Sequence, residues 1–323
     1  MKKSISYIIL SICGLLMVIP FVWMLTTSVK SQLEVNKGNV GFLPVEEYSI
    51  YQKNGIDYRI TPIKVDGDSI YIHLFDKDMN RIRSYEKVAS SDIVNKKKFM
   101  LHFENYKEAF TKVPFKRYFI NTLFVSFSVV FGVLITGALA AYAFAIMRFK
   151  GRDFIFYLFI SMMMVPQPVY LIPSYVLLNH LGWIDTYQAL IIPWIANIFT
   201  IFLLRQQFKT IPDELFDAAR IDGCGRLRTL WKLVLPLSKS VIATAAIFGF
   251  IGSWNSFMWP LVMTDSPAIR VLQVGLSYFS QEASAQTSLL MAASTFSILP
   301  LVILFIFAQK QIIASFASSG LKG

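Results

Sequence analysis

The sequence has few charged residues and very few cysteines. Only 16% of its 323 residues are charged, whereas 55% are hydrophobic. This is too little charge to cover the surface of a soluble domain of this length, and the apolar residues gather in long runs, which indicates a membrane protein. The two cysteines, Cys13 in an apolar run and Cys224 in a basic loop, are expected at different depths. We therefore predict no structural disulfide between them.

The long apolar runs contain no Asp, Glu, Lys or Arg. Ion-coupled carriers usually need such a group within the membrane, so its absence argues against a self-powered carrier; sodium sites made of carbonyl and hydroxyl groups keep that class open. The sequence also lacks a G-x-x-x-x-G-K-[ST] phosphate-binding loop, metal-ligand spacing among its three histidines, and any paired carboxylates or nucleophile–base set. We predict no enzymatic activity, cofactor or metal, and we expect a partner to supply energy.

Six uncharged runs meet or approach the length of about 20 apolar residues that a helix needs to cross the bilayer. They are Ser4–Val29, Tyr118–Met147, Phe154–Ile184, Thr186–Leu204, Ser240–Thr264 and Ala283–Gln309. In the third run, Pro166, Pro168 and Pro173 predict either a re-entrant or interfacial stretch beside one span, or a simple kink. The predicted fold class is an all-α polytopic membrane protein with six transmembrane helices.

Lysine and arginine alternate between the short connections. They are frequent at the N-terminus, after the second and fourth runs and in the C-terminal tail, whereas the other short connections hold only Arg270. Because these residues collect on the cytoplasmic side, both termini and the basic loop 205–239 are expected in the cytoplasm. The formal charge of +11 has the same explanation, and no nucleic-acid partner is predicted. The first run is too long for a typical secretory signal and is expected to remain uncleaved.

Four regions follow from this topology. They are a first helix (1–30), an extracytoplasmic loop (31–117), a five-helix core (118–310) and a cytoplasmic tail (311–323). Within the loop, an insert at about 46–101 alternates apolar and polar residues around polar turns at Asp66–Asp68 and Asp76–Asn80. The pattern predicts three antiparallel strands at Tyr58–Val65, Ser69–Phe75 and Ile82–Val88. Whether this small β-rich insert binds a partner or merely decorates the surface is left open.

A short amphipathic helix is predicted inside the basic loop. Pro212 with Asp213 and Glu214 makes a good helix start, because acidic residues face the positive helix end. Gly223 makes a good end. An apolar side is formed by Leu215, Phe216, Ala219 and Ile221. A helix of this kind suits a cleft on another protein, although the pattern alone fits an ordinary surface helix better.

The centre of this helix has the pattern Asp217-Ala218-Ala219-x-x-Asp222-Gly223, followed by Leu235-Pro236. It resembles the EAA motif of permeases of ATP-binding-cassette (ABC) importers, with Asp217 in place of the motif's Glu and Cys224 in place of its usual Ala. In that family the loop forms a coupling helix that docks in a groove of the ATP-binding subunit. The resemblance implies that loop 212–236 couples to the ATPase. The implied contact residues are Asp213, Glu214, Leu215, Asp217, Ala218, Ala219, Asp222 and Gly223.

Further stretches narrow the resemblance. They are Phe103-Glu104-Asn105-Tyr106, Asn121, Ala140-Ala141-Tyr142-Ala143-Phe144, Pro173 with Gly182-Trp183, Trp254-Asn255-x-Phe257-x-Trp259-Pro260-Leu261 and Gly320-Leu321-Lys322-Gly323. Together they resemble the MalG-type sugar permeases. The resemblance covers the chain except roughly Glu46–Leu101, which is an insertion relative to the shorter first external loop of that family.

The resemblance implies a type I importer in the bacterial cytoplasmic (inner) membrane, surrounded by lipid. Its parts would be this chain, a second MalF-like permease, two ATP-binding subunits and an extracytoplasmic solute-binding protein, with a sugar or oligosaccharide as substrate. Closure of the ATPases on ATP would move the docked coupling helices and rock the permeases between inward-facing and outward-facing states. The alternatives are an ABC permease for a peptide or an ion, and a secondary transporter or channel that works without an ATPase.

Neutral sugars are held by amide and hydroxyl groups and by stacking on aromatic faces. Within the apolar runs, the candidate residues for such contacts are Gln167, Asn197, Trp254, Asn255 and Trp259. Trp254 and Asn255 form the favoured pair, because they join a stacking plane to an amide. The alternative interpretation, favoured on general grounds, is that the amide bonds a neighbouring helix and the tryptophans pack or anchor at the membrane interface.

Overall fold

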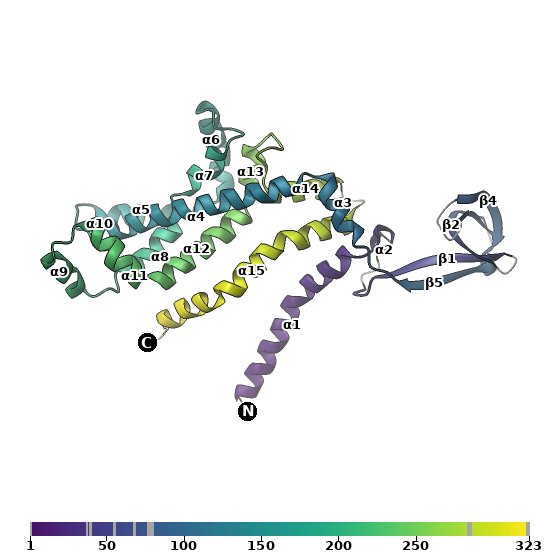
Figure 1. Ribbon diagram of the computed structural model, residues 1–323, viewed down its shortest axis with the longest axis horizontal. Coiled ribbons are helices and arrows are strands. Elements are labelled where there is room, and N and C mark those ends of the chain that lie inside the picture. The colour runs from purple at the N-terminus through teal and green to yellow at the C-terminus, as the bar shows by residue number, and fades with distance from the viewer. Residues whose placement is uncertain are drawn as a thin grey trace. The chain divides into compact units, whose positions relative to one another are not determined.

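The computed structural model describes residues 2–36, 38, 41–53, 56–66, 69–75, 81–282 and 286–320. The chain forms two compact units, each treated separately below (Figure 1). The first comprises Met1–Lys112 and Phe279–Phe296, and the second comprises Val113–Tyr278 and Ser297–Gly323. The sequence did not predict that part of the C-terminal region joins the first unit. There the backbone N–H of Ser288 donates to Gln32 at 3.1 Å, and Lys112 donates to Gln286 at 2.8 Å.

The first unit begins with helix α1 (Lys2–Ser28), followed by the short helix α2 (Gln32–Asn36) and, after a sheet, by helix α3 (Glu104–Lys112). A buried amide ties these helices together, because Asn105 of α3 donates to the carbonyl oxygens of Ser28 and Lys30, both at 2.9 Å. Lys30 in turn pairs with Glu34 at 3.5 Å, and both side chains are almost fully buried. Buried groups of this kind need partners, and each finds one here.

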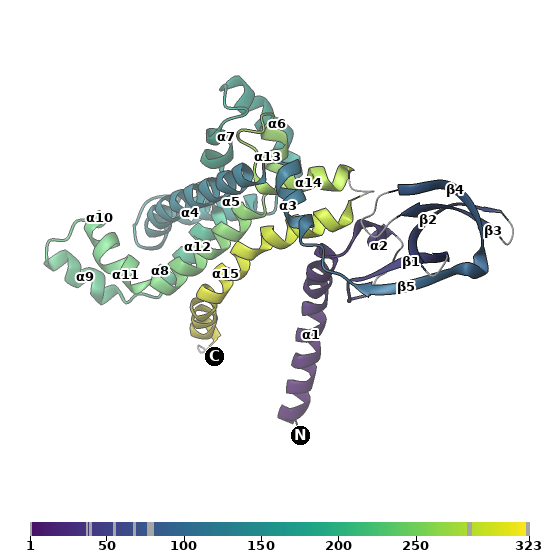
Figure 2. The ribbon, with the colours of Figure 1, turned by 45° about the vertical axis from the view of Figure 1, so that its right-hand side comes forward.

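A five-stranded antiparallel sheet with the order β4-β3-β2-β1-β5 lies in sequence between α2 and α3. Its strands are β1 (Val45–Lys53), β2 (Ile56–Asp66), β3 (Ser69–Phe75), β4 (Arg81–Ala89) and β5 (Ile93–Phe99), with a single 3-10 turn at Ser90–Asp92. The three predicted strands are confirmed as β2, β3 and β4, and β1 and β5 are additional. Gly67–Asp68 of the first predicted turn and the whole of the second, Asp76–Asn80, lie outside the described residues. Figure 2 shows that the sheet is strongly curved.

One face of the sheet carries the core of the insert. Ile60, Ile72, Leu74 and Val88 are buried there. The edge strand β5 is lysine-rich, as is common on edges that avoid pairing with other chains. Its Lys96 donates to Asp57 at 2.9 Å, and this hydrogen bond raises the pKa of the lysine. The chain enters and leaves the sheet at neighbouring points, because the N–H of Met100 after β5 donates to the carbonyl oxygen of Pro44 before β1 at 3.2 Å.

Four described helical segments are long and apolar enough to cross a membrane. They are Ile5–Ser28, Phe115–Ala145, Tyr187–Phe208 and Thr287–Lys310. Two further segments pass the same test only as bent pairs: α5 (Arg152–Met162) with α6 (Gln167–His180), bent by 100°, and Arg226–Leu237 with α12 (Lys239–Trp254), bent by 86°. The proline-rich third run therefore contains a sharp break before Gln167, larger than an ordinary helix kink.

The second unit is built around the long helix α4 (Phe115–Ala145). Its remaining elements, in chain order after α5 and α6, are α7 (Tyr187–Ile191), a 3-10 turn (Ile192–Trp194), α8 (Ile198–Phe208), α9 (Asp213–Ile221), α10 (Arg226–Thr229), a π-helical turn (Leu230–Val234), α11 (Leu235–Leu237), α12 and α13 (Met258–Met263). Helix α14 (Leu272–Glu282) belongs to this unit up to Tyr278, and α15 (Thr287–Gly320) belongs to it from Ser297. Helix α4 packs against both α8 and α12.

Small residues on α4 allow this close packing. A Cβ atom on Gly132 would lie 2.4 Å from Cγ2 of Ile195, and one on Gly137 would lie 2.9 Å from Cγ2 of Thr200. Between them, Thr136 donates to the carbonyl oxygen of Gly132 at 2.9 Å and also bonds that of Ile195. Glycine and threonine at a helix crossing are typical of membrane helices, where close approach replaces the hydrophobic drive for packing.

The Gly132→Ala variant is expected to lose about 1–3 kcal/mol of stability, because the new methyl group overlaps Ile195 and the helices must separate. Thermal unfolding of the purified protein measures this loss. The matched control is Gly14→Ala in α1, where no atom lies within 4 Å of the added Cβ. Equal melting temperatures for the two variants would contradict the tight crossing.

Candidate functional site

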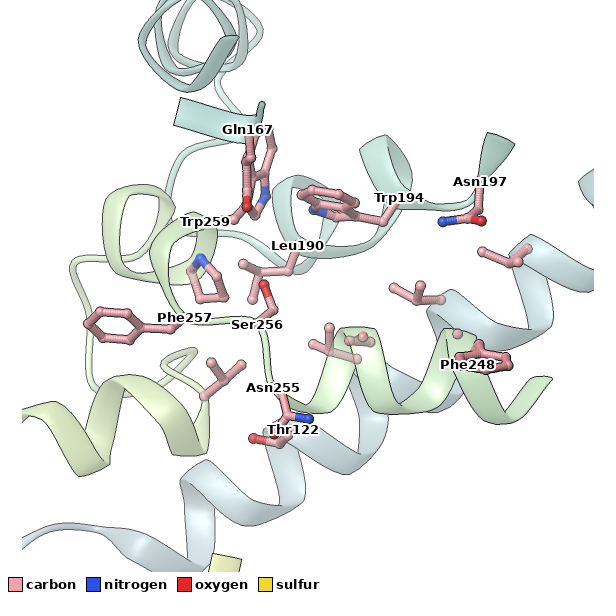
Figure 3. Close-up of a pocket in the computed structure, with 18 of the residues that line it drawn as sticks. Thr122, Gln167, Leu190, Trp194, Asn197, Phe248, Asn255, Ser256, Phe257 and Trp259 are labelled. Atoms are coloured by element: carbon pink, nitrogen blue, oxygen red, sulfur yellow. The ribbon is translucent and has the colours of Figure 1, made fainter. Parts of the chain in front are cut away.

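A cavity of about 360 Å³ lies within the second unit (Figure 3). Its walls come from α4, the start of α6, the stretch that joins α7 to α8, the second half of α12 and the residues that follow α12. None of the described residues that line it is charged. A cavity of this size with a few polar groups among apolar and aromatic side chains is typical of small-molecule sites.

Four of the five candidate residues line this cavity: Gln167, Asn197, Asn255 and Trp259. In Figure 3, Asn197 lies at the upper right, beyond Trp194, and Asn255 lies near the lower centre beside Thr122. Asn197 uses its Oδ1 atom to accept the backbone N–H of Thr200 at 2.8 Å, which caps α8 and leaves its NH₂ group available. Trp259 is held by a 2.9 Å hydrogen bond from its indole N–H to the carbonyl oxygen of Ala189. The cavity therefore presents amides that a solute can bind.

The fifth candidate, Trp254, does not line the cavity. Its side chain is fully buried, and its indole N–H donates to the carbonyl oxygen of Ser297 at 3.2 Å. Its ring stacks on Phe250 at 5.5 Å and meets the edge of Phe119 at 5.7 Å. The favoured pair is thus divided: Asn255 lies at the cavity, and Trp254 packs inside the protein.

The sequence interpretation missed several residues that line the cavity. Trp194 supplies an aromatic plane there and meets Trp259 edge-on at 5.2 Å between ring centroids. Hydroxyl groups come from Thr122, Ser253 and Ser256. Hydroxyl residues are common in membrane helices and gave no distinct signal.

The Trp254→Phe variant is expected to lose about 1–3 kcal/mol of stability, because the carbonyl oxygen of Ser297 is left buried without its donor. Thermal unfolding gives the measurement. Trp231→Phe is the control, since the side chain of Trp231 is 58% exposed and its loss of an N–H group costs little. If both substitutions lowered the melting temperature equally, Trp254 would have no special packing role.

The loop between α13 and α14 is held over the start of α4. Asn121 donates to the carbonyl oxygens of Ala268 at 2.8 Å and Arg270 at 3.0 Å, and its own carbonyl accepts the hydroxyl of Tyr187 at 2.9 Å. Asp185 fixes the same loop from the other side. It has a left-handed backbone (φ 60°), and its carboxylate accepts the N–H groups of residues 265 and 266 at 3.1 and 2.9 Å. These bonds keep one end of the cavity wall in place.

The predicted helix in the basic loop is confirmed as α9. Gly223 follows it with φ +71°, and the N–H of Cys224 reaches back to the carbonyl oxygen of Ala219 at 2.9 Å, which forms a regular C-terminal cap. Only part of its predicted apolar side faces inward. Phe216 is 4% exposed and belongs to a core cluster with residues of α4, whereas Ile221 is 87% exposed.

The remaining candidate coupling residues are mostly on the surface of α9. Exposed are Asp213, Glu214, Leu215, Asp217, Ala218, Asp222 and Gly223, and Ala219 is half-buried. A short helix that is anchored by one buried phenylalanine and presents exposed apolar residues suits a binding partner. From α9 the chain continues through α10, the π-helical turn and α11 to the 86° bend. After the bend it forms α12, whose second half lines the cavity.

Comparison with known proteins gives a family match for residues 119–317, described as a binding-protein-dependent transport system inner membrane component. The arabinooligosaccharides transport system permease protein AraQ of Halalkalibacterium halodurans is 36% identical over 224 residues, which cover 69% of this chain and 80% of AraQ. The sn-glycerol-3-phosphate transport system permease protein UgpE of Yersinia pestis is 32% identical over 208 residues, 64% of this chain and 74% of UgpE. A bacterial ABC transporter involved in the import of the acidic polysaccharide alginate has a similar fold, with a TM-score of 0.65, 21% identity and 95% of each chain covered.

Proposed function

Because this chain belongs to the family of binding-protein-dependent transport system inner membrane components, we propose that it forms half of the translocation path of a bacterial sugar importer. The observation that carries the sugar assignment is the uncharged cavity. Amides of Gln167, Asn197 and Asn255 lie there with the ring of Trp194. Amide donors and acceptors beside an aromatic plane match the hydroxyl groups and the apolar ring faces of a saccharide.

The two kinds of relative differ in substrate charge. AraQ is named for arabino-oligosaccharides, which are neutral, and UgpE for sn-glycerol-3-phosphate, which is anionic. A phosphate ester is usually bound by arginine, lysine or a helix N-terminus. The starts of α6 and α8 lie at the cavity, but its described lining offers no cationic side chain, and this favours a neutral sugar or oligosaccharide.

The proposed topology has six membrane spans. The four long apolar helices and the two bent pairs make up this number when each pair counts as one span. The lysine- and arginine-rich connections favour a cytoplasmic location for both termini and for α9. The curved β-sheet between α1 and α4 is then outside the cytoplasm, and the protein lies in the bacterial inner membrane.

The proposed partners are a second MalF-like permease, two ATP-binding subunits and an extracytoplasmic solute-binding protein. Helix α9 is the proposed contact with one ATPase. Its exposed residues dock in the ATPase, and buried Phe216 transmits the movement to α4. The chain that leads from α9 into α12 carries the same movement to the cavity wall. ATP-driven closure of the ATPases thereby switches the cavity between the two sides of the membrane.

Reconstitution in liposomes tests this function. The chain is combined with its partner permease, ATPase and solute-binding protein, and uptake of labelled arabino-oligosaccharide and of labelled glycerol 3-phosphate is measured. We expect uptake of the neutral oligosaccharide that requires ATP and the binding protein. Solute entry that is independent of ATP would contradict the importer, and uptake of glycerol 3-phosphate alone would contradict the sugar assignment.

The insert is proposed to extend the docking platform for the solute-binding protein. Its excision is feasible because Pro44 and Met100 are hydrogen-bonded neighbours, so residues 45–99 are replaceable by a short Gly-Ser link. We expect the apparent affinity for the binding protein to fall about tenfold, a loss of about 1.4 kcal/mol. The readout is ATPase stimulation by the binding protein, with unstimulated ATPase activity as the control. Unchanged stimulation and uptake would show that the insert has another role.

A further inference from the structure

A second cavity, of about 260 Å³, lies at the other end of α4, beyond its substrate-facing residues. It is bounded by the last residues of α4, by α9 and by α10. It shares no lining residue with the first cavity. Its character is opposite: three arginines line it, namely Arg148, Arg220 and Arg226, and they come from three different segments of the chain.

The positive charge of this cavity is poorly balanced. No acidic side chain lines it among the residues that the structure describes. Asp217 pairs with Arg220 at 2.6 Å, but both side chains are largely exposed, and such pairs contribute at most about 1 kcal/mol. Among the described residues, Arg148 and Arg226 have no ion-pair partner. Three arginines around one hollow give it a positive potential that attracts anions.

A tyrosine hydroxyl opens onto the same cavity. Tyr142 lines the cavity and is only 7% exposed. Its hydroxyl makes no hydrogen bond within the described residues and opens onto the cavity, so it is free to donate to a ligand. An anion in the cavity would accept this hydrogen bond. The arginines favour a ligand with negative charge, and the tyrosine hydroxyl adds a donor beside them.

We propose that this cavity binds a phosphate group. Phosphate presents several charged oxygens in different directions, and guanidinium groups bind it more strongly than any other side chain does because they donate in pairs. Arg148, Arg220 and Arg226 bind its oxygens, and Tyr142 donates to one of them. The group is either the headgroup of an anionic phospholipid or a free phosphate compound. Basic hollows between membrane helices at the cytoplasmic face are places where anionic lipid headgroups bind.

A bound phosphate has a mechanical consequence. It joins Arg148, which follows the last turn of α4, to Arg220 of α9 and Arg226 of α10. These contacts add to the packing of Phe216 and hold α9 against the membrane core. Occupancy of the cavity therefore stiffens the connection between the exposed face of α9 and the rest of the protein.

Binding by the purified full-length chain tests the proposal. The probes are dioctanoyl phosphatidylglycerol, dioctanoylglycerol as the same lipid type without phosphate, and inorganic phosphate. Native mass spectrometry detects the lipids, and phosphorus NMR detects phosphate. The double variant Arg148→Gln/Arg226→Gln is compared with Arg228→Gln/Lys232→Gln, which removes the same charge from exposed positions outside the cavity.

We expect the wild type and the control variant to bind a phosphate-bearing probe, and the cavity variant to bind it at least tenfold more weakly. Tyr142→Phe is expected to weaken binding severalfold without loss of charge. Binding of phosphatidylglycerol alone assigns the site to lipid, and binding of inorganic phosphate as well assigns it to the free anion. Equal weakening in the two double variants, equal binding of dioctanoylglycerol, or no binding by the wild type would overturn the proposal.

Discussion

The Ala218→Arg variant is expected to lose ATP-driven uptake almost completely while its membrane fold remains intact. Ala218 lies on the exposed surface of α9, so a larger side chain disturbs no packing within this chain. It does obstruct a partner that closes over the helix. Central interface positions are worth about 2 kcal/mol or more, which corresponds to a loss of coupling of about thirtyfold or more. The measurement is ATP-dependent uptake by the reconstituted importer.

The control for this variant is Gln206→Arg, an equally large cationic substitution at an exposed position of α8, outside the proposed contact. It is expected to keep most of the uptake. Co-purification of the ATPase distinguishes a lost ATPase contact from a general effect of the added charge. The Ala218→Arg chain should recover less ATPase than the control chain does. Normal uptake by the Ala218→Arg variant would exclude α9 as the coupling contact.

The second large effect is expected at the cavity, where Asn255→Leu should weaken sugar binding by this importer. The side-chain amide of Asn255 lies at the cavity after the last residue of α12 and is exposed. Leucine has similar size but can neither donate to nor accept from a sugar hydroxyl. A polar group left without its partner costs about 1–3 kcal/mol, which predicts a loss of affinity of about 5- to 150-fold.

Sugar binding is best measured on the purified importer that is held in its ATP-bound state with a non-hydrolysable analogue, because uptake also depends on the affinity of the solute-binding protein. The control is Asn179→Leu, which removes an exposed amide of α6 that does not line the cavity. If Asn255→Leu bound sugar as the wild type does, the second permease would hold the substrate without this chain.

The sequence predicted the helical elements well wherever apolar runs were long. Four of the six uncharged runs correspond to long apolar helical segments, and the proline-rich run corresponds to a bent pair. The fifth run, Ser240–Thr264, contains only α12 of the second bent pair. It predicted the strands less completely. Strands β2, β3 and β4 alternate apolar and polar residues, whereas β5 contains three consecutive lysines and joins the sheet as an edge through its backbone.

The sequence predicted the residue types at the candidate site, amides and tryptophans, but not every residue. Trp254 and Asn255 are neighbours in sequence, and the end of α12 falls between them, so they face different surroundings. A helix turns by about 100° per residue, and adjacent residues rarely share a face. Nothing in the sequence distinguished the buried Trp254 from Trp194 at the cavity, because both lie in uncharged runs.

The sequence also did not predict which residues of α9 are buried. Its periodicity predicts one apolar side, but it does not show that Phe216 packs on α4 and that Ile221 is left on the surface. Which apolar residues face a second protein depends on that protein. The phosphate-binding cavity is similar in this respect, since its three arginines are far apart in sequence and are brought together only by the fold.

The most direct test of the importer assignment is to tag this chain, purify it gently from its host membrane, and identify the co-purifying polypeptides by quantitative mass spectrometry. The proposed function predicts one second permease for each copy of this chain, and an ATP-binding subunit at about twice that amount. Recovery of this chain alone, with solute movement in liposomes that needs no ATP, would contradict it and would favour a self-contained carrier.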